Sequence, residues 1–135
     1  MKIKFLVFAL VFFTGYECCS QNLIGIEKSM IPGLIKKEMK GLNLDKSAKN
    51  ESFNYLKFIN AAGTRTLLVF FDDKNKSVST RLICDYSEID FLTTEMNKVY
   101  KKTGENSWEY SVDADKFEIN LEKKEWYFVV NTKKK

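Results

Sequence analysis

The pattern of hydrophobic and polar positions predicts two helices, each followed by three strands. Residues 23–40 and 87–103 carry apolar side chains at the three- and four-residue spacing of an amphipathic helix. Pro32 indicates that the first helix either begins at that residue or kinks there. In the second helix, Ser87 is expected to cap the start and Gly104 to end it, after a last turn rich in lysine.

The strands are predicted from alternating or continuous runs of apolar residues between short polar turns. These runs are residues 52–60, 64–72, 77–86, 108–112, 117–121 and 126–130. Short polar connections favour antiparallel hairpins. We therefore expect a single α+β domain in the order α-β-β-β-α-β-β-β, with a mostly antiparallel curved sheet and two helices packed on one face. The repeated order also hints at a pseudo-repeat.

Two of the predicted strands are apolar on both faces. In the first, Leu67, Val69 and Phe71 share one face, and Leu68 and Phe70 share the other. Two helices are expected to cover one face of the sheet, so a remaining apolar face would enclose a cavity, meet another chain or fill with aromatic side chains. The candidate binding residues of these strands are Leu67, Val69, Phe71, Trp126 and Phe128.

Residues 1–20 have the pattern of a secretory signal peptide. Lys2 and Lys4 precede the apolar run Phe5–Phe13, and small and polar residues follow it. The run is too short to cross a bilayer. We expect cleavage after Ser20, a mature domain of residues 21–135 without a transmembrane helix, and a secreted or periplasmic location. The alternative is a lipid anchor at Cys18 or Cys19, although the residues before each fit that pattern poorly.

Composition removes several classes of chemistry. The chain of 135 residues contains no histidine, which excludes the commonest general base, the histidine-dependent triads and most zinc sites. Its charges are well mixed, with a net charge of +4, so no nucleic-acid partner is predicted. Cys84 would be the one thiol left after export, and we interpret it as a small buried residue. No catalytic residue, cofactor or metal site is predicted.

Acidic pairs lie in predicted turns and at a helix start, at Asp72/Asp73, Glu88/Asp90 and Asp113/Asp115. Two acids that converge in a cleft would suit glycoside hydrolysis, whereas the calcium-loop pattern is incomplete. The leading hypothesis is an exported non-enzymatic binding module that uses an apolar sheet face or edge for an apolar small molecule or an envelope protein. The alternatives are a small carboxylate-dependent hydrolase of envelope sugars, and an inhibitor or protective partner of a secreted enzyme.

Overall fold

The structure, a computed structural model, describes residues 22–47 and 54–135. The predicted signal peptide, the anchor candidates Cys18 and Cys19, and the start of the first predicted strand lie outside these residues. The helical elements are the short 3₁₀ helices η1 (Lys28–Met30) and η2 (Tyr86–Glu88) and the α-helices α2 (Ile31–Glu38) and α3 (Ile89–Val99). The strands are β1 (Leu42–Leu44), β2 (Tyr55–Asn60), β3 (Arg65–Phe71), β4 (Ser77–Asp85), β5 (Lys101–Gly104), β6 (Ser107–Val112), β7 (Asp115–Lys123) and β8 (Tyr127–Lys134).

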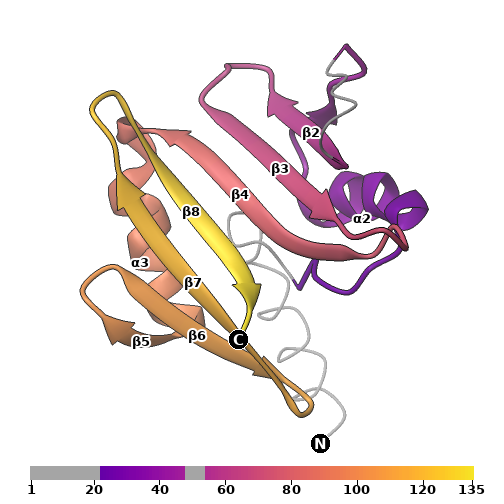
Figure 1. The fold of residues 1–135 in the computed structure, drawn as a ribbon. Coiled ribbons are helices and arrows are strands. Elements are labelled where there is room, and N and C mark those ends of the chain that lie inside the picture. The colour runs from indigo at the N-terminus through magenta and orange to yellow at the C-terminus, as the bar shows by residue number, and fades with distance from the viewer. Residues whose placement is uncertain (1–21, 48–53) are drawn as a thin grey trace, which may run out of the picture.

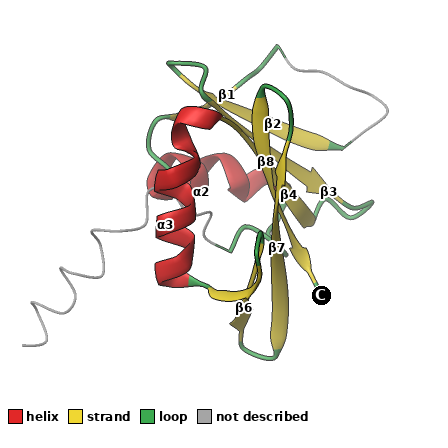
Figure 2. Ribbon diagram, turned by 90° about the vertical axis from the view of Figure 1, so that its left-hand side faces the viewer, coloured by secondary structure: helices red, strands yellow, loops and turns green. Residues whose placement is uncertain are grey.

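All eight strands join one antiparallel sheet in the order β1-β2-β3-β4-β8-β7-β6-β5. Figure 1 looks onto the face opposite the helices, and Figure 2 shows α2 and α3 together on the other face. The predicted α+β fold is therefore confirmed. Each half also gains a short edge strand, β1 or β5. Both halves run from a helix into a four-stranded meander, and their last strands, β4 and β8, pair at the centre.

The face beneath the helices is a filled hydrophobic core. A row of cross-strand neighbours runs through it from Leu67 to Leu82, Val130 and Leu121, all of them buried. The largest fully buried side chains are Trp108, Phe58, Phe128, Ile31, Ile35, Leu67 and Leu92. The helices and all strands except β5 thus contribute to one core, in which aromatic rings supply much of the buried area.

Helix α2 begins at Ile31, so Pro32 stands in its first turn, where proline is tolerated. Pro32 occupies the first turn of the helix, after the 3₁₀ helix η1. A proline in the first turn removes no intrahelical hydrogen bond, so the helix starts there instead of kinking. Gly41 follows the helix with a φ of 97°, a left-handed conformation that favours glycine.

Both predicted ends of the second helix were wrong. Helix α3 begins at Ile89, after the 3₁₀ helix η2, and the side chain of its own N-terminal cap residue, Glu88, makes no capping hydrogen bond. Asp85 caps η2, because its carboxylate accepts a hydrogen bond from the Ser87 N–H at 2.9 Å. The helix ends at Val99 and not near Gly104. Tyr100 is extended, and the lysine-rich residues that follow form β5, which pairs with β6. The pairing of β5 with β6 therefore outweighs the preference of these lysines for the last turn of a helix.

The alternation of side chains along residues 77–86 predicts that Val78 shares the face of Leu82 and Cys84, and a β-bulge in β4 makes this prediction wrong. Phe70 pairs with Ser79, but Phe71 pairs with Ser77, so Val78 is the extra residue. The side chain of Val78 is exposed, whereas Ser77 is buried next to the core. An insertion of one residue reverses the face of every earlier position in the strand.

Ser77 fixes the start of the described chain against the sheet. Its hydroxyl donates a hydrogen bond to the Leu23 carbonyl and accepts one from the Ile26 N–H at 2.9 Å. Its backbone exchanges two further hydrogen bonds with this segment, through Gly25 and Ile26. The bulge therefore turns a polar side chain inward where two backbone groups need a partner.

The substitution Ser77→Ala is expected to lower the free energy of unfolding by about 1–3 kcal/mol, because it leaves a buried carbonyl and N–H without their partner. Urea unfolding measures the loss, and faster hydrogen exchange at Ile26 locates it. Ser79→Ala is the matched control, because Ser79 is only half-buried on the opposite face and makes no such contact. Equal effects of the two substitutions would contradict this role for Ser77.

Candidate functional site

The structure separates the candidate binding residues into two groups. Leu67, Val69, Phe71 and Phe128 lie in the core beneath the helices, where each is at most 7% exposed. Trp126 is 79% exposed in the turn between β7 and β8. The five residues therefore do not form one surface, and their role in ligand binding stays a prediction.

Most described side chains on the opposite face of the sheet are partly or fully exposed to solvent. We call it the outer face and define it by the residues that the strand register places there. Its more apolar half contains Tyr55, Ile59, Leu68, Phe70 and Ile83, which are partly exposed, and Val129, which is buried; Lys57 and Thr66 lie among them. Its polar half contains Arg81, Glu118, Asn120, Glu122, Asn131 and Lys133. Among the described residues, α2 and α3 both lie on the other side of the sheet, so neither helix covers this face (Figure 2).

A hollow of about 340 Å³ lies in the polar half of the outer face. The polar side chains that line it come from β4, β7 and β8, and Phe70 of β3 forms part of its wall. The alternation of side chains along residues 77–86 predicts that Arg81 and Ile83 lie on the face opposite Cys84, and the structure places them there. The sequence did not show that Asn131 and Asn120 lie beside Arg81, because that depends on the pairing of distant strands.

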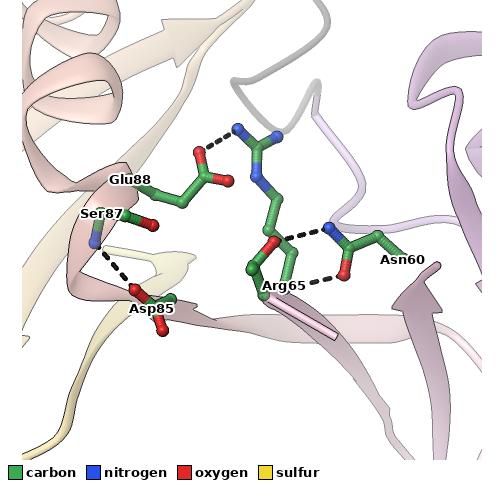
Figure 3. Close-up of polar contacts among 6 residues, drawn as sticks. Asn60, Arg65, Asp85, Ser87 and Glu88 are labelled. Carbon is green, nitrogen blue, oxygen red and sulfur yellow. Dashed lines mark hydrogen bonds and ion pairs between the residues drawn. The ribbon is translucent and has the colours of Figure 1, made fainter. Parts of the chain in front are cut away.

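A second polar cluster joins the two halves of the fold next to α3 (Figure 3). Arg65 and Glu88 form an ion pair of 2.7 Å between Nη2 and Oε2, and their side chains are 19% and 22% exposed. The Arg65 N–H also donates a hydrogen bond to Asn60 Oδ1 at 3.0 Å. These contacts tie the hairpin of β2 and β3 to the start of α3. They engage Glu88, one of the acids considered for catalysis, in a structural pair.

Cys84 is buried beside this cluster and is only 1% exposed. Burial raises the pKa of its thiol to about 12 and outweighs the opposing attraction of the Arg65 guanidinium. The thiol is therefore protonated at neutral pH, whereas a nucleophilic cysteine needs a lowered pKa. The interpretation of Cys84 as a buried residue is confirmed.

The pKa of Cys84 predicts a loss of stability at alkaline pH. Since the pKa is higher in the folded protein than its ordinary value of 9.0, the unfolded chain loses this proton first. The contribution is complete below pH 9 and falls as the pH rises towards the folded pKa, by at most about 1.4 kcal/mol per pH unit. The stability difference between the native protein and Cys84→Ala should shrink between pH 8 and 11 in urea unfolding. A constant difference would contradict the raised pKa.

Two of the remaining candidate acids, Asp72 and Asp115, are engaged in structural contacts. Asp72 accepts hydrogen bonds from the N–H groups of Lys74 and Lys76, as expected for the hairpin turn. Asp115 pairs with Lys134 at 3.0 Å. In residues 22–47 and 54–135, no three His, Cys, Asp or Glu side chains are grouped as metal ligands would be. The hydrolase hypothesis therefore gains no specific support from these contacts.

No protein-family model, no curated protein and no solved structure matches this chain. Among the described helices, none combines the length and the apolar character that a membrane crossing requires.

Proposed function

We propose that this protein is an exported, non-enzymatic binding module and that the outer face of its sheet is the binding surface. Export rests on the signal-peptide pattern of residues 1–20, with a secreted or periplasmic product or, as the alternative, a lipid anchor at Cys18 or Cys19. The choice of the outer face as the binding surface is supported by one observation. Among the described residues, both α-helices lie on one side of the sheet, and neither covers the outer face, which has an apolar and a polar part (Figure 2).

The apolar half supplies the contact area that such a surface needs. Tyr55, Leu68, Phe70 and Ile83 are all partly exposed, and the rings of Tyr55 and Phe70 lie 6.1 Å apart. Aromatic and aliphatic side chains at the centre of a contact, beside polar groups, are typical of interfaces. The side chains on the face beneath the helices are buried in the hydrophobic core, where they stabilise the fold.

The edges of the sheet are weaker candidates than its face. Strand β1 contains only three residues, and β5 contains four, two of which are lysines. The pairing of β5 with β6 is also irregular between Lys102 and Gly104. Short, charged and irregular edge strands resist the addition of another strand. We therefore favour binding through the face over binding through an edge.

Nuclear magnetic resonance of the ¹⁵N-labelled protein tests the proposal. Titration with a solubilised envelope fraction of the native cell should shift or broaden amide signals of the outer face and leave those of α2 and α3 unchanged. Leu68→Asp should abolish the effect, because it places a charge in the apolar half. Phe91→Asp is the matched control, since Phe91 is 47% exposed on α3. Perturbation of α3 alone, or no perturbation at all, would refute the proposal.

A further inference from the structure

The polar half of the outer face has the features of a binding site for a small polar ligand. Its hollow of about 340 Å³ is open to solvent on one side, and its volume is close to the lower limit of small-molecule pockets, roughly 300 Å³. Arg81, Asn131 and Asn120 are cross-strand neighbours on three adjacent strands, so they form one row of planar polar side chains. Phe70 stands at the end of the hollow nearest β3.

The row is partly pre-organised and leaves polar groups available for a ligand. Arg81 Nε donates a hydrogen bond to Asn131 Oδ1 at 3.0 Å, which orients the guanidinium. Among the described residues, its terminal nitrogens have no further partner, and the Asn120 amide has none. An amide offers both donors and acceptors, and a guanidinium offers a fork of donors. Neighbouring hydroxyl groups of a sugar match such a mixture of donors and acceptors.

The charges in the hollow indicate the sign of the ligand. Lys133 pairs with Glu118 at 3.4 Å, and Glu122 pairs with Lys124 at 3.1 Å. Within the described part of the chain, Arg81 has no carboxylate partner. The hollow therefore holds one uncompensated positive charge with the planar geometry that suits a carboxylate. One such cation is too few for a nucleic-acid backbone, which contacts several basic residues.

Phe70 supplies an apolar wall beside this row. Its ring is partly exposed and packs at a tilt against Tyr55. The C–H groups on one face of a sugar ring can pack against an aromatic ring while its hydroxyl groups face polar side chains. The hollow combines these two kinds of surface next to the Arg81 guanidinium, which has no carboxylate partner among the described residues.

We infer that this hollow binds a saccharide that carries a carboxylate, such as a uronic acid unit. Arg81 would bind the carboxylate, Asn120 and Asn131 the hydroxyl groups, and Phe70 the apolar face of the ring. The inference rests on the proposed function, because it assigns a ligand class to part of the same outer face.

Titration of the purified protein with tri-galacturonic acid, followed by ¹⁵N chemical shifts, tests the inference. Galactotriose is the uncharged comparison. We expect at least tenfold tighter binding of the acidic trisaccharide, with shifts at Arg81, Asn120 and Asn131. Arg81→Gln should abolish this preference. Lys123→Gln removes the same charge outside the hollow and should leave the preference unchanged.

Equal affinity for the two trisaccharides, unchanged binding by Arg81→Gln, or no binding of either sugar would overturn the inference. Urea unfolding of both variants verifies that they fold, as expected for exposed side chains. If both sugars fail while an envelope fraction still perturbs the outer face, the saccharide inference alone is wrong. If the envelope fraction also fails, the proposed function is wrong as well.

Discussion

The substitution Trp108→Ala is expected to lower the free energy of unfolding by about 3–5 kcal/mol. Trp108 is 1% exposed on the inner face of β6, where it is the cross-strand neighbour of Ile119. Its indole N–H donates a hydrogen bond to Asn97 Oδ1 on α3 at 2.8 Å. Alanine would leave a cavity under α3 and a lost contact between helix and sheet. Domains of this size are stable by only about 5–15 kcal/mol, so the loss is a large fraction of the total.

Trp126 provides a control of the same residue type in the same protein. It is 79% exposed in the turn between β7 and β8. Trp126→Ala should change the free energy of unfolding by no more than about 0.5 kcal/mol. Urea unfolding followed by circular dichroism compares both variants without relying on tryptophan fluorescence. A similar loss for the two variants would mean that the core is not where the structure places it.

The second large effect is expected at Leu67, where aspartate should prevent folding. Leu67 is completely buried between the sheet and the helices, opposite Leu82. A carboxylate there would have no partner, and an unpaired buried charge costs several kcal/mol even after relaxation of the protein. Leu67→Asp should therefore lack the dispersed amide spectrum of a folded protein at 25 °C. A folded Leu67→Asp variant of native stability would contradict the assignment of this face to the core.

Leu68→Asp, one residue along the chain, is the matched variant. Leu68 lies on the outer face and is the cross-strand neighbour of Arg81. An aspartate there stays in contact with solvent and faces a cation, and opposite charges across strands stabilise a sheet by about 0.2–1 kcal/mol. We expect a folded protein with near-native stability in urea. Unfolding of this variant would show that the outer face is covered.

The sequence predicted the elements and the faces of most strands. The alternation around Leu67 and Leu68 assigned the two sides of β3 correctly, because side chains alternate by a fixed geometry. The turn at Asp72 and the buried position of Cys84 were also readable, since both depend on local chemistry. Alternation predicted the wrong face for Val78, because the bulge at this residue depends on how β4 pairs with β3.

The hollow in the polar half of the outer face was the least predictable part of the structure. Arg81 and Asn131 are fifty positions apart in the sequence and meet only because β4 pairs with β8. Nothing in either strand specifies that pairing. It follows from the packing of both halves on one core, which decides which strands become neighbours.

The sequence by itself determined the α+β class, the two helix-and-strand halves and the absence of histidine chemistry. These features depend on composition and on periodicities of a few residues. Only the tertiary structure decided which apolar face became the core, that the Val78 side chain is exposed at a bulge, and which polar groups are neighbours on the outer face. The physical reason is that these outcomes depend on contacts between distant segments, whose energies no local pattern contains.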